Sequence, residues 1–403
     1  MSPLDQSHAP ITQAAAETIG VARLSKLAFD GGDLMPLWRS LIDRYVTGDC
    51  DAAALMDLAT LEQLLGNSEG GLACQRAALE RGQLYRSPGA ERAALRLLAL
   101  AAPGDIGANT PLEFLVEGSD IALDTLYILP GRAPDALPPC DLVIVAAGES
   151  DANRPVLDAI GRLTAQQRVP VLNDAARVAL LSRERVAAMT QDVPGLLAPM
   201  ARRLGRAAIA AGAVGPFPII VRPIDSHAGR GLARLDDGAA LEAYLAERPE
   251  EEFFVTPFAD YRGADGLYRK YRIAFIDGEP YACHMAIADQ WMIYYLNAGM
   301  RDSAQKRDEE ARFLRGFDWD FAYRHEAALA DVAERIDLDY FAIDCGELPD
   351  GRLILFEADI AMIVHAMDPP DLFPYKGAQM RKVFDAFQAM LHRRARARLG
   401  VAA

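Results

Sequence analysis

Between residues 93 and 175 the chain alternates short apolar runs with helical stretches, and this alternation constrains the fold more than any other feature of the sequence. Four segments carry a short apolar run that ends at Gly, Asp or Asn: RAALRLLALAAPGD, SDIALDTLYILPG, CDLVIVAAGESD and RVPVLND. Between the last two, the spacing of Val156, Leu157, Ile160 and Leu163 predicts a helix with one apolar face. Strands separated by helices predict a small parallel sheet, which binds ligands beyond the carboxyl ends of its strands. Since no GxGxxG motif opens a helix after the first strand, a dinucleotide site is not expected.

Residues 1–92 predict a separate helical region, because Ala, Leu, Glu and Arg are abundant and β-branched runs are missing. The stretch DAAALMDLATLEQLLGNSEGGLACQRAALERGQLYRSPG (51–89) predicts two helices joined by GNSEGG. This pair resembles one tetratricopeptide-type hairpin, although no second copy follows at a fixed period. We expect helices that pack on the neighbouring domain, with a peptide-binding groove as the alternative.

Residues 176–403 predict a third unit with mixed strands and helices. FPIIVRP and GLARL are expected strands around the glycine turn DSHAGRG, and EEFFVTPFADY is a strand interrupted by Pro257. YRKYRIAFIDGEPYACHMAIA predicts a hairpin around Asp277-Gly278, and a last helix spans 376–398. The fold class is therefore α+β, with a helical region (1–92), a small α/β domain (93–175) and a larger domain (176–403).

Composition limits the partners of the chain. The formal net charge of −15 argues against a general nucleic-acid binder or a protein that binds anionic membranes. We interpret the basic tail LHRRARARLG (391–400) as a solvated helix end whose cations complement the helix dipole. The five cysteines are scattered without CxxC spacing, which favours a reducing cytoplasm over a disulfide or zinc framework. With no signal-like N-terminus and no long apolar run, we expect a cytoplasmic protein.

A pair of carboxylates ends one expected strand, in GRLILFEADIAMIVHAMDPP (351–370). Glu357 and Asp359 are two positions apart and therefore project to the same face. The turn PDGR connects this strand to DYFAID, so Asp344 can lie beside the pair. Three carboxylates without Cys or His suit a hard cation, and we predict Mg²⁺, which usually binds together with substrate phosphates.

The order of these elements resembles the ATP-grasp superfamily, specifically the glutathione-synthetase-like and RimK-type carboxylate–amine ligases, over residues 95–390. IDCGELPDGRLILFEAD matches the metal-binding Asp and the Glu-x-Asn of that family, with Asp359 in place of Asn. The resemblance implies that 93–175 is the Rossmann-like pre-ATP-grasp domain. It also implies that 176–403 is the ATP-grasp domain, with a small lid subdomain at 185–260 and a large subdomain at 261–403.

The resemblance also implies roles for individual residues. In VPVLNDAARVALLSRERVAAM it places a nucleotide-contacting cation at Arg185, and in FPIIVRPIDSHAGRG it places Arg222 and the glycine loop over the phosphates. RKYRIAFIDGEPY supplies Arg272, which with Arg222 is implied as catalytic, and the backbone of FFVTPFADY contacts adenine. The implied ATP-binding residues are Arg185, Arg222, Ser226, His227, Gly229, Arg230, Gly231, Thr256, Pro257 and Phe258. The implied metal ligands are Asp344, Glu357 and Asp359.

The chain departs from the family pattern around the acceptor substrate. Both lysines on the nucleotide side are arginines, IAMIVHAMDPP replaces a Ser-Pro-Gly-like turn, and CHMAIADQWMIYYLNAGM replaces a segment with a basic residue. The acceptor pocket is therefore expected to differ from that of the well-known ligases. The candidate substrate residues are Lys270, His284, Asn297, His365 and Lys376.

Each feature also has an ordinary structural explanation. A glycine turn can join any hairpin, Glu357 and Asp359 can end a solvated strand, and Asp344 can be a turn residue. Arg272 can be a cross-strand partner, and histidines are more often packed than catalytic. Three aromatic residues are expected in the core: Trp291, Tyr294 and Tyr295. The common order and spacing of the motifs favour the functional interpretation.

The resemblance implies an ATP- and Mg²⁺-dependent ligase that joins a carboxylate to an amine through an acyl phosphate, on a small molecule, a peptide or a natural product. The alternatives are a small-molecule kinase with the same fold, and a helical-repeat binding protein with a degenerate nucleotide site. We expect a homodimer, and the helical region could recognise a peptide or protein partner.

Overall fold

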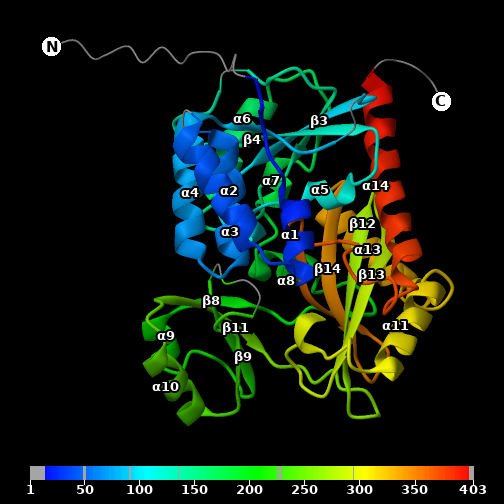
Figure 1. Ribbon diagram of the computed structural model, residues 1–403. Helices are drawn as coiled ribbons and strands as arrows, with labels where there is room; N and C mark the ends of the chain where they lie inside the picture. Colours follow the sequence, from blue (N-terminus) through cyan, green and yellow to red (C-terminus); the bar gives the residue numbers. More distant parts are fainter. Residues whose placement is uncertain are drawn as a thin grey trace.

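The computed structural model describes residues 14–48, 51–89, 92–134, 136–224, 226, 229–293 and 295–398. These residues form a mixed α and β structure with three sheets, and the basic layout is visible in Figure 1. The six-stranded sheet lies at the top, with helices α1–α4 beside and below its left side, and the other two sheets lie below it. In the described part of the chain no helix is both long and apolar enough to cross a bilayer.

The six-stranded sheet has the order β1-β2-β4-β3-β5-β6. Its strands are β1 (Ala16–Glu17), β2 (Leu84–Arg86), β3 (Leu95–Ala101), β4 (Ile121–Tyr127), β5 (Leu142–Val145) and β6 (Val171–Leu172). Strands β4, β3, β5 and β6 are parallel, as the alternating pattern predicts. The expected apolar face of α6 (Arg154–Thr164) is buried. Strands β1 and β2 join this sheet from the region predicted to be only helical, so the sheet crosses the expected boundary at residue 92.

Four helices precede and flank this sheet: α1 (Val21–Phe29), α2 (Met35–Thr47), α3 (Ala52–Leu64) and α4 (Ser68–Arg81). Helices α3 and α4 are the expected hairpin, but α4 begins at Ser68, so the connection is shorter than GNSEGG. Gly71 of α4 packs closely on α3. A Cβ atom at this position would be 2.7 Å from the Ala59 carbonyl oxygen, so a larger residue would clash with the α3 backbone. The likeness to a tetratricopeptide repeat stays a prediction.

The four-stranded antiparallel sheet has the order β10-β9-β11-β8. Its strands are β8 (Arg202–Gly205), β9 (Ile219–Pro223), β10 (Ala233–Leu235) and β11 (Glu252–Pro257). Helices α9 (Arg206–Ala210) and α10 (Gly238–Glu247) accompany it. The expected strand–turn–strand–helix–strand order is therefore present in this region.

The five-stranded sheet has the order β13-β12-β14-β15-β7. Its strands are β7 (Leu196–Leu197), β12 (Tyr268–Ile276), β13 (Glu279–Ala288), β14 (Tyr340–Glu347) and β15 (Leu353–Asp359). The predicted hairpin turn is present, with positive φ at Asp277 (50°) and Gly278 (83°), as a type I′ turn requires. Strand β7 pairs with β15 although it falls in the range expected for the lid subdomain.

The remaining helices connect and cover these sheets. They are η1 (Ile106–Ala108), α5 (Leu112–Leu115), α7 (Ala175–Val178), α8 (Arg183–Thr190), η2 (Tyr295–Asn297), α11 (Ala304–Gly316), α12 (Phe321–Arg324), α13 (Glu326–Ile336) and α14 (Lys376–Arg398). Helix α14 runs along the right edge of Figure 1 and contacts β5, β12 and β13.

The basic end of α14 is not simply solvated, which corrects the expectation for this segment. Arg393 and Arg394 form ion pairs with Asp277 at 2.6 and 2.8 Å, and Arg394 also pairs with Asp339 at 2.8 Å. These cations bind the turn before β13 and the start of β14, so the charges at the helix end serve tertiary contacts as well as the helix dipole.

Candidate active site

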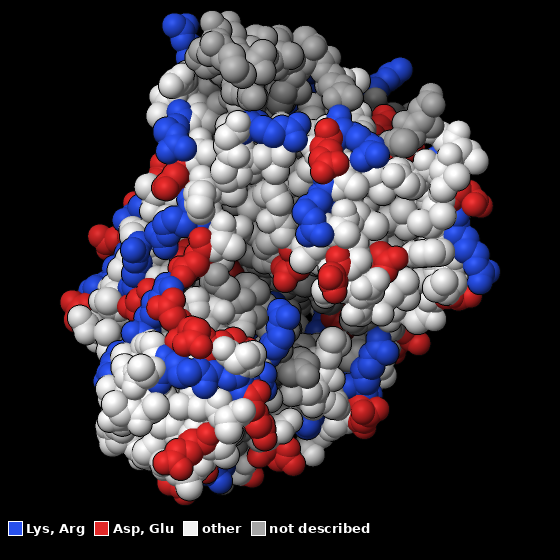
Figure 2. Space-filling view, turned by 90° about the vertical axis from the view of Figure 1, so that its left-hand side faces the viewer, with Lys and Arg blue, Asp and Glu red and all other residues white. Residues whose placement is uncertain are grey.

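A cavity of about 1270 Å³ lies between the four-stranded and five-stranded sheets. Side chains of β9 and β11 line one wall, and side chains of β12, β14 and β15 line the other. Residues of α1, α3 and α4 also border it. Figure 2 views the molecule from the left side of Figure 1 and shows basic and acidic side chains intermixed over the middle and lower part of that face. The cavity is therefore lined by segments that lie far apart in the sequence, from Ser25 to Met380.

Asp344 is the most buried charged group of the cavity wall. It lies in the middle of β14, opposite Arg272 on β12 and Glu357 on β15. Its side chain is 1% exposed, and its carboxylate accepts hydrogen bonds from Lys270 at 2.7 Å and Arg272 at 2.8 and 3.0 Å. Burial opposes ionisation, but the charges of Arg272 and Lys270 outweigh it and hold the pKa of Asp344 well below its usual range. The Asp344 carboxylate is thus ionised, and the strand register that brings Asp344 beside Glu357 is as predicted.

Glu357 forms an ion pair with Arg183, a residue that the sequence motifs did not single out. Burial opposes ionisation of Glu357, but the Arg183 charge prevails and lowers the pKa of this carboxyl. Arg183 opens α8, two residues before the predicted Arg185. Residues two apart in a helix point in different directions, and Arg185 instead donates to the Ala179 carbonyl at 3.1 Å while still lining the cavity. The sequence feature that could have pointed to Arg183 is its place in the same helical turn as the predicted Arg185.

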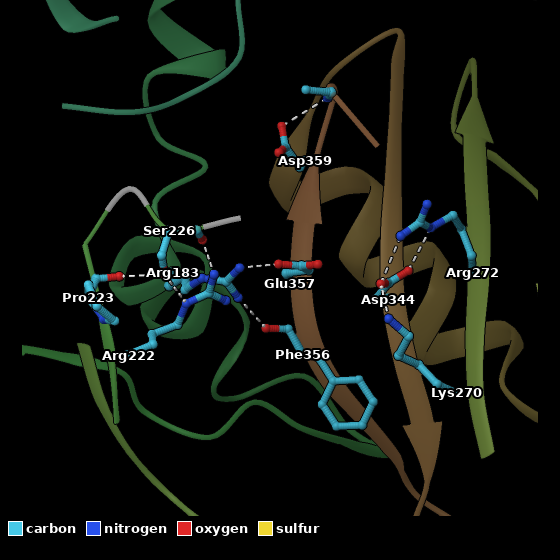
Figure 3. Close-up of polar contacts among 11 residues, drawn as sticks. Arg183, Arg222, Pro223, Ser226, Lys270, Arg272, Asp344, Phe356, Glu357 and Asp359 are labelled. Carbon is cyan, nitrogen blue, oxygen red and sulfur yellow. Dashed lines mark hydrogen bonds and ion pairs between the residues drawn. The ribbon is translucent and has the colours of Figure 1, made fainter. Parts of the chain in front are cut away.

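Arg222 connects β9 to the glycine turn that follows it. Its Nε atom donates to the Ser226 hydroxyl at 3.1 Å, and its Nη2 atom donates to the Ser226 carbonyl. Burial and the nearby Arg183 charge lower the pKa of Arg222 to about 9. Figure 3 shows Arg183 and Arg222 side by side on the β9 side of the cavity, with Arg183 reaching toward Glu357. Two cations held this close favour an anion between them.

The other residues of the predicted phosphate loop divide into three groups. Ser226, Gly229 and Arg230 line the cavity, whereas Gly231 is not part of the lining. Gly231 has φ 68° and packs against Pro223, where a Cβ atom would lie 2.7 Å from the proline ring, so its role is to shape the turn. His227 lies outside the described residues.

The three predicted metal ligands do not converge in this structure. Asp344 and Glu357 face cations, and Asp359 Oδ1 accepts a hydrogen bond from the Ala361 N–H at 3.0 Å. Within the described ranges no group of three Asp, Glu, His or Cys side chains is arranged to hold a metal ion. Figure 3 shows Asp359 apart from the other two carboxylates, at the far end of β15. Arginine and lysine balance the acids here, and Mg²⁺ binding stays a prediction.

The predicted adenine-contacting residues border the cavity at the end of β11. Thr256, Pro257 and Phe258 all line it. The Arg234 guanidinium lies 4.2 Å from the centre of the Phe258 ring, and Trp291 packs edge-on at 5.9 Å. A flat apolar group could stack in such surroundings. Trp291 and Tyr295, expected in the core, are instead only partly buried and line the cavity, while Tyr294 lies outside the described residues.

Most of the predicted substrate residues line the same cavity. Lys270, His284, His365 and Lys376 line it, but Asn297 does not, because its side chain donates to the Met292 carbonyl at 3.3 Å. Burial and the Arg272 charge keep the pKa of His284 well below its usual range. Both histidines are therefore neutral at pH 7, since burial also lowers the pKa of His365 to about 4.

Lys376 belongs to a buried ionic cluster that sequence analysis missed. Its Nζ atom lies 3.2 Å from Glu310 and 3.0 Å from Asp368, and 3.9 Å from the centre of the Tyr295 ring. Glu310 also accepts hydrogen bonds from the hydroxyls of Tyr295 (3.0 Å) and Tyr375 (2.6 Å). These residues come from distant parts of the chain without a common motif, so spacing alone gave no signal for the cluster.

Comparison with known proteins gives distant structural likenesses. No protein-family model and no curated protein sequence matches the chain. The D-Ala:D-Ser ligase VanG from Enterococcus faecalis has 13% sequence identity and a TM-score of 0.46, over 74% of this chain and 99% of that one. A RimK domain ATP-grasp protein from Sphaerobacter thermophilus has 17% identity and a TM-score of 0.41, over 73% and 99%. The D-alanine–D-alanine ligase from Coxiella burnetii has 9% identity and a TM-score of 0.45, over 75% and 97%. Scores below 0.5 assign no residue role and no reaction to this chain.

Proposed function

We propose that the chain is an ATP-dependent ligase that activates a carboxylate as an acyl phosphate and transfers the acyl group to an amine. The observation that carries this proposal is the row of cations between the two sheets. Arg183 and Arg222 approach from α8 and β9, and Lys270 and Arg272 from β12. Cations on both walls of one cavity suit a polyphosphate that lies between them.

The residues at the end of β11 and the neighbouring Trp291 suit the base of a nucleotide. Phe258 and Trp291 offer aromatic surface for a base. The cavity of about 1270 Å³ has room for a nucleotide and a second substrate together. The motif resemblance described above places the same segments around ATP.

The carboxylates fit Mg²⁺ in their chemistry, since they form a set of oxygen donors only. Asp344 and Glu357, which are paired across neighbouring strands, are the residues that would hold the ion. In this structure the same carboxylates are balanced by Arg183, Lys270 and Arg272. When bound, Mg²⁺ would neutralise phosphate charge.

The chain's own residues would act by position and charge rather than as acids or bases. Arg183 and Arg222 would neutralise the terminal phosphates, and Arg272 would stabilise the charge of the acyl phosphate. The substrate carboxylate would attack the γ-phosphorus of ATP, the bond from this phosphorus to the β–γ bridging oxygen would break, and ADP would leave. The neutral amine would then attack the acyl carbon, the bond to the phosphate oxygen would break, and the proton of the amine would leave with inorganic phosphate or pass to water. The loop around Ser226 would exclude water, which would otherwise hydrolyse the intermediate.

Nucleotide binding is tested by the melting temperature with ATP, with and without Mg²⁺. We expect ATP to stabilise the wild type by several degrees at concentrations far above Kd, and Mg²⁺ to increase the shift. Glu357→Gln should lose the Mg²⁺-dependent part of the shift. The matched control is Glu347→Gln on the same sheet, whose partners Arg324, His325 and Tyr271 lie outside the cavity lining, and it should keep that part. A wild type that ATP does not stabilise would contradict the proposal.

The reaction type is tested by the products. A ligase releases ADP and inorganic phosphate in equal amounts and forms an amide. A kinase of similar fold forms ADP and a phosphorylated hydroxyl without free phosphate. Phosphorylated product in the absence of amide would replace the ligase proposal with the kinase alternative.

A further inference from the structure

The segment after β15, IAMIVHAMDPP (360–370), is one of the places where the chain departs from the family pattern described above. Residues 361–365, 367 and 368 of this segment line the cavity. Arg272 Nη1 donates a hydrogen bond to the Ile363 carbonyl at 2.9 Å, and Lys376 Nζ lies 3.0 Å from the Asp368 carboxylate. Cations of β12 and α14 therefore fix this segment beside the cavity.

Two phenylalanines from earlier parts of the chain pack on this segment at His365. The Phe29 ring of α1 packs edge-on against the imidazole at 5.8 Å, and the Phe114 ring of α5 lies 6.2 Å from it. Both phenylalanines line the cavity, and so do Met362, Met367 and Met380. This part of the cavity therefore provides aromatic and thioether surface for an apolar group. Phe29 lies outside residues 95–390, so the family resemblance gives it no role.

Arg272 has donors left for an acceptor in the same cavity. A guanidinium carries five N–H groups. The Nε and Nη2 atoms of Arg272 donate to Asp344, and Nη1 donates to the Ile363 carbonyl, which uses three of the five. Figure 3 shows the third nitrogen of this guanidinium pointing away from Asp344. The two N–H groups that remain, one on each Nη atom, can donate to the carboxylate of a bound molecule.

The charges around His365 also favour an anion. Burial lowers the pKa of His365 to about 4. Among the described charged residues, Lys376 and Arg272 lower this pKa further, and Asp368 alone raises it. Two cations and one carboxylate therefore act on the ring against which both phenylalanines pack.

Three other charged residues in this region do not reverse that balance. The Arg301 guanidinium lies 5.1 Å from the centre of the Phe29 ring and adds a further positive charge. Glu310 is fully buried outside the cavity lining, and burial raises its pKa. Asp359, at the end of β15, has no effect on the pKa of His365. A carboxylate placed near His365 is therefore favoured over an ammonium group.

We propose that the carboxylic acid activated by this ligase carries an apolar group, such as a phenyl ring, which packs on Phe29 and Phe114. Its carboxylate lies at Arg272, the residue that would stabilise the charge of the acyl phosphate. The inference rests on the proposed ligase function, to which it adds the class of the acid substrate. It also gives the helical region a part in specificity, since Phe29 belongs to α1.

The first test compares three small probes by calorimetric titration of the full chain without nucleotide. 3-Phenylpropanoate carries both features, propanoate has only the carboxylate, and 3-phenylpropylamine has the ring with the opposite charge. We expect 3-phenylpropanoate to bind at least about tenfold more tightly than either of the others. Equal binding of propanoate would overturn the apolar part, equal or tighter binding of 3-phenylpropylamine would overturn the acid part, and no binding of 3-phenylpropanoate would overturn both.

Variants then place the probe in the cavity. Phe29→Ala should weaken 3-phenylpropanoate about tenfold and leave propanoate nearly unchanged. Phe29→Glu puts a carboxylate beside Arg301, where it has a partner of opposite charge and repels a bound acid. This variant should reduce or reverse the preference for 3-phenylpropanoate over 3-phenylpropylamine, which keeps the test decisive if Phe29→Ala does not fold.

The matched control is Tyr323→Ala, at a 72% exposed position outside the cavity lining, and it should bind all three probes as the wild type does. Unchanged binding of 3-phenylpropanoate in Phe29→Ala, or an unchanged preference in Phe29→Glu, would overturn the inference.

The ATP shift of the wild type keeps the two proposals distinguishable. If ATP stabilises the chain but 3-phenylpropanoate does not bind, the substrate class is wrong and the nucleotide site stands. If 3-phenylpropanoate binds but ATP gives no shift, the apolar acid pocket stands without the ligase function.

Discussion

At the scale of single residues, the environment of each carboxylate decides its ionisation. Asp344 and Asp57 are both buried, at 1% and 2% exposure. Two cations hold the pKa of Asp344 low, whereas burial raises the pKa of Asp57 to about 6 despite the N–H groups of Ile19 and Gly20. The same side chain is therefore a permanent anion at one site and a titrating group at the other.

Asp57 predicts a pH dependence of stability. Its pKa in the folded state, about 6, lies above the ordinary value of 3.8. A raised pKa means that the stabilisation is complete below pH 3.8 and is lost as the pH rises through 6. Relative to Asp57→Asn, the free energy of unfolding of the wild type should fall by about 2 to 3 kcal/mol between pH 4 and pH 7.

Urea unfolding of both proteins at several pH values measures this difference. The comparison cancels the pH dependence of all other groups. A difference that stays constant from pH 4 to pH 7 would show that Asp57 does not titrate in this range.

At the scale of elements, close approach between helices α3 and α4 depends on one small residue. A Cβ atom at Gly71 would lie 2.7 Å from the Ala59 carbonyl oxygen and 2.6 Å from Gln63 Cγ. The carbonyl belongs to the α3 backbone and cannot move by itself. Glycine in the first turn of α4 is therefore a packing requirement, although it weakens the helix.

Gly71→Ala should destabilise the chain by about 1 to 3 kcal/mol, because the overlap outweighs the better helix propensity of alanine. The matched control is Gly238→Ala at the start of α10, where a new Cβ atom meets no atom within 4 Å. This control should be neutral or slightly stabilising. Thermal and urea unfolding measure both variants, and equal stability of the two would contradict the packing argument.

At the scale of the whole molecule, α14 forms a common core with two of the sheets. Phe387 is fully buried in a cluster that includes Leu97 and Leu142 of the six-stranded sheet and Ala274 of the five-stranded sheet. Its ring packs edge-on against Tyr340 at 5.2 Å. Units that share such a core should unfold together.

Phe387→Ala should lower the free energy of unfolding by about 3 to 5 kcal/mol, because it leaves a cavity in this shared core. Calorimetry should show one transition for the wild type and a lower or divided transition for the variant. Tyr323→Ala removes an aromatic ring from an exposed position and serves as the control. Loss of stability by the control to the same extent would contradict a special role for α14.

Much of the fold followed from local patterns. Alternating apolar runs predicted the parallel strands, the Asp277-Gly278 pair predicted the hairpin turn, and the last helix begins and ends as expected. These features depend on neighbours in sequence, so periodicity and turn chemistry report them well. Strands β1 and β2 were missed because two- and three-residue strands have no period of their own.

The candidate site followed from the sequence only in part. The residue types that could bind a phosphate or a metal ion were evident from the sequence. The strand register of Asp344 and Glu357 was predicted from the length of the hairpin. The partners of these acids were not evident, because Arg183 and Lys270 are 174 and 74 positions away from the carboxylates they bind. The homodimer and the peptide partner of the helical region stay predictions.

By itself, the sequence determined the succession of strands and helices and the strand end at which the carboxylates lie, since both depend on interactions between residues close in the chain. Only the tertiary structure decided that these carboxylates face arginine and lysine, that Phe29 borders the cavity, and that α14 joins two sheets. Such contacts depend on how distant segments pack, and many packings satisfy the same local pattern. The charge balance of the site and the surface offered to a second substrate therefore belong to the folded molecule.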